Sequence, residues 1–173
     1  MVTRYSLSLR FLHWLLALLL IIGLGVGLVM TDMPLSPFKL KVYSWHKWLG
    51  VSIFFLVLIR LCVRIRQSVP ELPRSMSASE QALAGIGHAL LYGLMVCIPL
   101  SGWLMSSAMG FQTVWFGVIP LPDLIPKNEE LGDQLVVLHS WLNWGLIFMI
   151  VAHVGAALKH QFIDKENFLR RML

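Results

Sequence analysis

Long apolar stretches alternate along the chain with short segments rich in charges, glycine and proline. The stretches predict four helices, at about residues 8–30, 42–66, 80–106 and 132–160. A helix needs roughly 20 apolar residues to cross the hydrocarbon core of a bilayer, and each stretch is long enough. Strands of a membrane barrel would alternate apolar and polar residues, and these stretches do not. The pattern therefore predicts an all-α membrane protein: a four-transmembrane-helix bundle that forms a single domain over residues 1–173.

Prolines separate the predicted helices. Pro34 ends the first stretch, and we expect Pro37 to confirm that break. Pro70 and Pro73 break the chain after the second stretch, and Pro99 should kink the third helix. The first stretch is about twice the length of a signal-peptide core and has no small-x-small cleavage site after it, so we expect it to remain as a span.

Composition agrees with a membrane protein. Hydrophobic residues make up 57% of the chain and charged residues 13%, whereas a soluble domain carries about 25% charged residues. The mean hydropathy is +0.73. A chain this apolar could not cover itself with polar surface, so membrane lipid is its predicted surrounding.

The basic residues predict an orientation. The net charge is +5, but Lys and Arg lie at the ends of the apolar stretches and form no stripe with aromatic neighbours, which argues against nucleic-acid binding. One side of the predicted bundle carries Arg4, Arg10, Arg60, Arg64, Arg66, Arg74, Lys159, Lys165, Arg170 and Arg171, and the other carries Lys39, Lys41, Lys47 and Lys127. Because cytoplasmic loops are enriched in Lys and Arg, both termini are predicted to be cytoplasmic.

Histidines are the polar residues that mark the apolar stretches. They are His13, His46, His88, His139, His153 and His160, and all but the last fall within or at the edge of a stretch. No Asp or Glu lies within an apolar core, although a proton pump or cation carrier would normally have carboxylates there. Polar side chains are costly in membrane helices and usually functional. Imidazoles without acidic partners indicate metal ligation, most commonly of haem iron; the alternative is a set of hydrogen-bonded bundle residues.

The positions of the histidines along the predicted helices form two levels. His139 and His153 lie 14 residues apart, which places them within about 40° of one helix face and about 21 Å apart along the axis. The second helix brings His46 to the level of His139, and the first brings His13 to the level of His153. The predicted haem iron ligands are therefore the pairs His46/His139 and His13/His153, while His88 could compete with His13.

Further residues are candidates for contacts with haem propionates or a quinone: Arg10, Arg60, His88, Lys159 and His160. The alternatives are that the basic residues only set topology and that His160 is a solvated interface residue. Glycines could make room for a flat macrocycle or simply let helices approach each other; they are Gly23, Gly25, Gly27, Gly50, Gly85, Gly87 and Gly145. Cys62 and Cys97 are interpreted as packing residues, and the absence of a CxxCH motif excludes covalent c-type haem.

Several short segments resemble bacterial cytochrome b561. They are Arg4 to Trp14, Trp45-His46-Lys47-Trp48-Leu49-Gly50, Gly87 to Tyr92, Leu138-His139-Ser140-Trp141, Ala152-His153 and Leu158 to Lys165. The resemblance covers essentially the whole chain, and the wider group includes the cytochrome b subunits of nickel–iron hydrogenases and formate dehydrogenases. In that family the first, second and fourth helices carry the haem ligands, with two on the fourth. The resemblance thus implies two haem b groups held by His13, His46, His139 and His153, with His88 set aside.

The resemblance also implies an activity. Stand-alone members are similar to superoxide:ubiquinone oxidoreductases, which implies an oxidoreductase of the bacterial inner membrane that moves electrons from a periplasmic donor, superoxide, to ubiquinone. Lys39, Lys41, Lys47 and Lys127 could attract such an anion. The alternatives are a haem b subunit of a larger dehydrogenase or hydrogenase complex with a redox partner protein, a histidine-based metal transporter, and a structural subunit without a cofactor.

Overall fold

The computed structural model describes residues 4–68, 70, 75–166 and 168–173; Pro73 and Arg74, used above, lie outside these ranges. Four long helices dominate: α1 (Leu7–Asp32), α2 (Pro37–Arg66), α3 (Ala78–Ala108) and α4 (Glu129–Leu158). A π-helical turn, η1 (Lys159–Ile163), continues α4, and α5 (Phe168–Met172) follows. All four long helices are long and apolar enough to cross a membrane. The predicted four-span helical bundle is confirmed, with the addition of a hairpin formed by β1 (Val114–Trp115) and β2 (Ile119–Pro120).

Each long helix begins at a residue whose side chain caps the first turn. Ser6, Ser36, Ser77 and Asn128 each accept a hydrogen bond from the backbone N–H three residues further on. The expectation for Pro37 was wrong, because this proline is the first residue of α2 and does not prolong the break. Proline suits a first helical position, where its fixed φ is favourable and no N–H is needed. The apolar pattern misses this turn because polar lysines occupy it.

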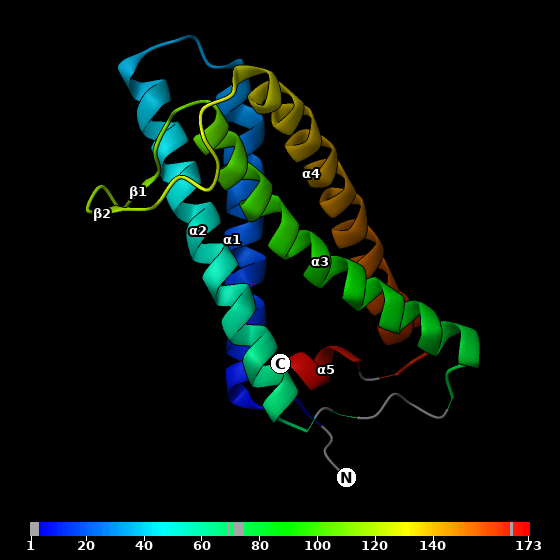
Figure 1. Ribbon diagram of the computed structural model, residues 1–173. Helices are drawn as coiled ribbons and strands as arrows, with labels where there is room; N and C mark the ends of the chain where they lie inside the picture. The colour runs from blue at the N-terminus through cyan, green and yellow to red at the C-terminus, as the bar shows by residue number, and fades with distance from the viewer. Residues whose placement is uncertain (1–3, 69, 71–74, 167) are drawn as a thin grey trace.

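The connection between α3 and α4 is an ordered loop that folds back on the bundle. Gly110, with φ of +76°, ends α3 in a Schellman arrangement: its N–H donates to the Ser107 carbonyl, and the Phe111 N–H donates to the Ser106 carbonyl. Phe116 and Gly117 both have positive φ at the turn of the hairpin, as a type I′ turn requires. Figure 1 shows this hairpin lying beside α2.

The helices pack in chain order, α1 on α2, α2 on α3 and α3 on α4. Both termini lie at one end of the bundle, here called the terminal end, and the hairpin lies toward the other, here called the hairpin end (Figure 1). Leu16, Val57, Met95 and Leu146 belong to a buried apolar cluster. Each of these residues lies in sequence between the terminal-end and hairpin-end parts of its helix, so the cluster forms a layer between the two ends.

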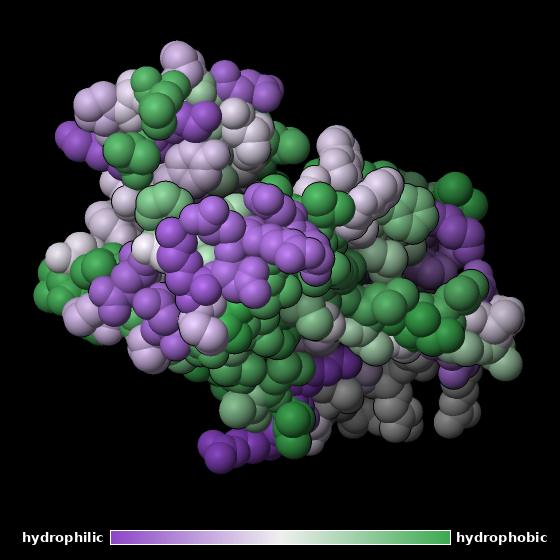
Figure 2. Space-filling view, turned by 45° about the horizontal axis from the view of Figure 1, so that its top comes forward, coloured by the Kyte–Doolittle hydropathy of each residue, from purple (hydrophilic) through white to green (hydrophobic). Residues whose placement is uncertain are grey.

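The outer surface of the bundle is apolar along its flanks. Large side chains such as Ile21, Phe148 and Val151 are more than half exposed. Figure 2 shows hydrophilic residues gathered at the end turned toward the viewer and hydrophobic residues over much of the flank below. Such a distribution suits a protein whose helices face lipid.

Candidate functional site

Two histidine rings face each other near the hairpin end. The ring centroids of His46 on α2 and His139 on α4 are 6.4 Å apart, and the ring planes are nearly perpendicular at 86°. Imidazole nitrogen binds a metal at about 2 Å, so two rings on opposite sides of one metal ion have centroids about 6.3 Å apart. The pair is therefore spaced for a shared metal ion.

Each of these rings lies against a glycine. A Cβ atom on Gly27 of α1 would lie 3.2 Å from His46 Cε1, and one on Gly102 of α3 would lie 3.1 Å from His139 Cε1. Larger residues at these positions would push the rings out of place. The sequence reasoning included Gly27 but missed Gly102; the pair of small residues Ser101-Gly102 within a stretch of larger ones is the signal that could have found it.

A cavity of about 560 Å³ opens beside this pair. Both His46 and His139 line it, together with apolar residues from all four long helices. The volume lies within the range of roughly 300–1,000 Å³ that is usual for cofactor sites. Among the described residues, the lysines Lys39 and Lys47 are the charged side chains that line the cavity.

Three histidine rings meet near the terminal end. The ring centroids of His13 on α1 and His153 on α4 are 6.2 Å apart, with the planes at 72°. His88 on α3 lies near the same ring, with its centroid 5.6 Å from that of His153. The structure therefore brings together the expected pair, and it also places the competing histidine within reach of His153.

A buried arginine accompanies these three rings. Arg60 is 8% exposed and lies close enough to His13, His88 and His153 to interact electrostatically with each. Its guanidinium stacks on the Tyr92 ring at 5.6 Å, and within the described ranges no carboxylate pairs with it. Its Nε and the Tyr92 hydroxyl are buried without a hydrogen-bond partner in this part of the chain. A buried cation with unused donors suits an anionic group such as a carboxylate.

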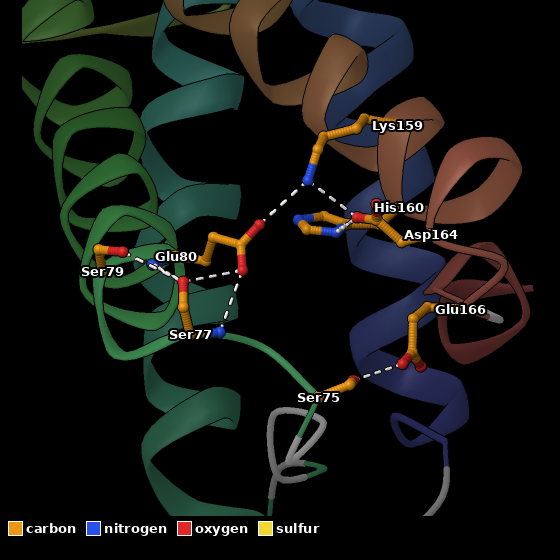
Figure 3. A network of polar contacts seen from close by, with 8 residues as sticks. All are labelled: Ser75, Ser77, Ser79, Glu80, Lys159, His160, Asp164 and Glu166. Carbon is orange, nitrogen blue, oxygen red and sulfur yellow. Dashed lines mark hydrogen bonds and ion pairs between the residues drawn. The ribbon is translucent and has the colours of Figure 1, made fainter.

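The other residues proposed for propionate or quinone contacts have different surroundings. The Nε atom of Arg10 is also buried without a partner among the described residues. Lys159 and His160, in contrast, belong to a polar network at the terminal end (Figure 3). Lys159 Nζ lies 3.0 Å from Glu80 Oε1 and 2.9 Å from Asp164 Oδ2, and His160 Nδ1 lies 2.7 Å from the same Asp164 oxygen. The Lys159 ammonium, with His160, lowers the pKa of the Asp164 carboxyl below its usual value.

The lysines near the hairpin end are mostly engaged. Lys47 Nζ donates to Ser106 Oγ at 3.0 Å and to the Phe111 carbonyl at 3.1 Å, which attaches the loop to α2. Lys39 donates to carbonyls at the end of α1, and Lys127 pairs with Glu129. Lys41 is exposed. The cationic character of the cavity therefore rests on Lys39 and Lys47.

The donor set fits haem better than a bare metal ion. Pairs of imidazoles on opposite sides, glycines against the rings and a large apolar cavity are what a flat iron macrocycle with two axial ligands requires. Among the described residues there is no group of three or more His, Cys, Asp or Glu side chains arranged to hold a metal ion.

Four apolar helices with imidazole rings paired at two levels define a helical-bundle membrane protein whose paired histidines suit haem. The family model of prokaryotic cytochrome b561 matches residues 4–173, so the chain belongs to that family. It is accordingly a membrane b-type cytochrome of electron transfer, and the family implies haem b.

Named relatives align over nearly the whole chain. Cytochrome b561 homolog 2 of Escherichia coli (strain K12) is 32% identical over 171 residues, which are 98% of this chain and 91% of the relative. The Yersinia pestis protein named "Probable superoxide oxidase CybB" is 30% identical over 175 residues, 98% of this chain and 96% of the relative. Cytochrome b561 homolog 1 of Escherichia coli (strain K12) is 30% identical over 172 residues, 98% and 97% respectively.

Proposed function

We propose that this protein is a di-haem oxidoreductase of the bacterial inner membrane that transfers electrons from superoxide to ubiquinone. The observation that carries the proposal is the opposition of imidazole rings at two levels of α4, with centroids 6.4 Å apart at one level and 6.2 Å at the other. The family membership and the name of the Yersinia pestis relative support the oxidoreductase activity.

The haem irons would be held by His46 with His139 near the hairpin end and by His13 with His153 near the terminal end. The centroid distance of 6.2 Å between His13 and His153 is closer to that of the hairpin-end pair than the 5.6 Å between His88 and His153. His88 then lines the terminal-end site. When bound, two haem b groups would supply one-electron redox chemistry.

The surrounding residues would bind the haem propionates, shield the sites from water and balance charge. Arg60, buried and without a carboxylate partner in the described chain, would bind a propionate, and Arg10 would assist it. The loop held by Lys47 would shield the hairpin-end site from water. Lys159 and His160 belong to a polar network at the terminal end, the side where an acceptor quinone would take up protons.

The donor would approach from the hairpin end, which the distribution of basic residues predicts to lie outside the cytoplasm. Lys39 and Lys47, the charged residues lining the cavity in the described chain, would favour an anion there. Each superoxide anion loses one electron and becomes dioxygen. Ubiquinone gains two electrons and two protons to become ubiquinol, so two superoxide anions are consumed for each quinol formed.

The test begins with the detergent-purified protein. A reduced-minus-oxidised absorption spectrum should have a b-type α band, and the haem content should be two per chain. His13→Ala should lose one haem while His88→Ala keeps both; the reverse result would make His88 the ligand. A haem-free protein with bound zinc or copper would instead support the metal transporter.

Activity is tested separately. Steady-state consumption of superoxide with ubiquinone should be abolished by His46→Ala and retained, with two haems, in Cys62→Ser at an exposed position of α2. A di-haem protein that consumes no superoxide and co-purifies with an iron–sulfur protein would contradict this donor and identify a subunit of a larger dehydrogenase.

A further inference from the structure

The ring of His139 rests on a short segment of α3 that contains Ser101 and Gly102. Ser101 Oγ lies 2.8 Å from the carbonyl oxygen of Ile98 and 2.9 Å from His139 Nδ1. Ser101 is 4% exposed, so water cannot easily replace either partner. The hydroxyl therefore connects the histidine directly to the backbone of the neighbouring helix.

The directions of these two hydrogen bonds determine the tautomer of His139. A serine hydroxyl has one proton, and a carbonyl oxygen can only accept, so Ser101 donates to Ile98. Its oxygen then accepts from His139, which means that Nδ1 carries the proton. A neutral imidazole protonated at Nδ1 has its lone pair on Nε2. Ser101, together with the Ile98 carbonyl that also lies within reach of the ring, thus selects the tautomer that binds a metal through Nε2.

Gly102 fixes the same ring from a second direction. A Cβ atom at this position would lie 3.1 Å from Cε1 and 3.5 Å from Nδ1 of His139. The ring therefore packs directly on the α3 backbone, and the Ser101 hydrogen bond sets its rotation.

The opposing ligand candidate lies near a backbone carbonyl, that of Gly23 on α1, and has no hydroxyl group behind it in the described chain. His46 also packs against a glycine, Gly27. Its Nδ1, however, is buried without a hydrogen-bond partner in the described part of the chain. The two sides of the hairpin-end site therefore differ in the groups behind the ligands.

We infer that Ser101 is a positioning residue for the hairpin-end haem: it orients His139, selects its Nε2-binding tautomer and lowers the midpoint potential of that haem. The inference rests on the proposed haem ligation by His139. A partner that accepts the Nδ1 proton makes the imidazole a more basic ligand, and a more basic ligand favours ferric iron. Removing the acceptor should therefore raise the potential.

The test is a redox titration of the di-haem protein with Ser101→Ala, Ser101→Thr and Ser107→Ala. Ser107 is the matched control, since it is a buried serine on α3 that also donates to a carbonyl, that of Trp103, but accepts from the Leu124 N–H and not from a histidine. In Ser101→Ala, the preference of the site for ferric over ferrous haem should fall by about tenfold. For a one-electron couple this change raises the midpoint potential of that haem by about 59 mV. Its ferric electron paramagnetic resonance signal should also shift as the ring leaves the 86° orientation. Ser101→Thr and Ser107→Ala should match the parent protein.

Each outcome has a distinct meaning. Loss of one haem in Ser101→Ala with retention in Ser101→Thr and Ser107→Ala would also support the role. Unchanged potentials and spectra in Ser101→Ala would overturn it, as would equal changes in Ser107→Ala. In that case loss of one haem from His139→Ala leaves the proposed ligation intact, whereas two haems in His139→Ala would overturn the ligation and the inference together.

Discussion

At the hairpin end, donors from α2 hold the α3–α4 loop through its carbonyls, whereas at the terminal end ion pairs join α3 to the end of α4. Lys47 and Trp48 donate to carbonyls of residues 111–114. At the other end Lys159 bridges Glu80 and Asp164. Hydrogen bonds from a half-buried cation are little affected by salt, but exposed ion pairs are weakened by salt and by acid. One bundle is thus closed by two kinds of interaction, and the ion pairs that join helices at the terminal end should respond to pH more strongly than the hydrogen bonds that hold the loop at the hairpin end.

The histidine sites differ in a parallel way. The hairpin-end pair has an uncharged hydroxyl, Ser101, behind one ring. The terminal-end rings have a buried cation, Arg60, beside them. A cation next to a redox centre favours its reduced form, so two haems bound as proposed would have different potentials.

The largest effect is expected when one proposed haem ligand is removed at either site. His139→Ala and His153→Ala should each lose one haem per chain, and the haem that remains should have a different midpoint potential in the two variants. Haem quantification with a redox titration measures both, and His160→Ala serves as the control with two haems. Equal potentials in the two variants would contradict the comparison of the sites.

Blocking the glycine contacts should weaken only the hairpin-end site. Gly27→Val and Gly102→Val place atoms where the His46 and His139 rings now lie. Overpacking of this kind costs about 1–3 kcal/mol, and haem titration should register it as weaker binding of one haem. Gly25→Val is the matched control, because a Cβ there meets nothing within 4 Å. Equal loss in the control would show a general helix effect.

Removing the cation that holds the loop should loosen the hairpin end. Lys47→Met deletes charged hydrogen bonds to Ser106 and Phe111, and the free energy of unfolding should fall by about 2 kcal/mol. Limited proteolysis should cut the segment 109–128 faster. Lys41→Met, at an exposed position on the same helix, should leave cleavage unchanged; equal cleavage in both variants would contradict the role of Lys47.

The smallest effect is a pH dependence at the terminal end. The Asp164 pKa is lowered in the folded protein by Lys159 and His160. Its stabilising contribution is therefore fully present above the pKa of the unfolded chain and is lost as the pH falls through the lower folded value. The Tm of the parent protein should fall as the pH is lowered. In Asp164→Asn the Tm should fall less steeply with decreasing pH. An identical dependence of Tm on pH in the two proteins would show that Asp164 does not cause the loss of stability in acid.

Much of the fold could be predicted because the signals are local. The length of each apolar stretch predicts a span, and the helical repeat puts His139 and His153 near one face. The first turn of α2 was missed, because Lys39 and Lys41 interrupt the apolar pattern although Ser36 and Pro37 make a favourable start. The haem ligand assignments stay predictions, although the structure brings the expected rings together.

The sequence by itself determined four spans, their order and two levels of histidine, since length, hydropathy and helical rise depend on one segment at a time. Only the tertiary structure decided that His88 also lies near His153 and that Ser101 and Gly102 contact the ring of His139. It also decided that Arg60 is buried without a carboxylate partner in the described chain. The reason is physical: helices in lipid are apolar on every side, so no amphipathic stripe identifies the face that turns inward. Rotation of each helix about its axis is set by packing against its neighbours.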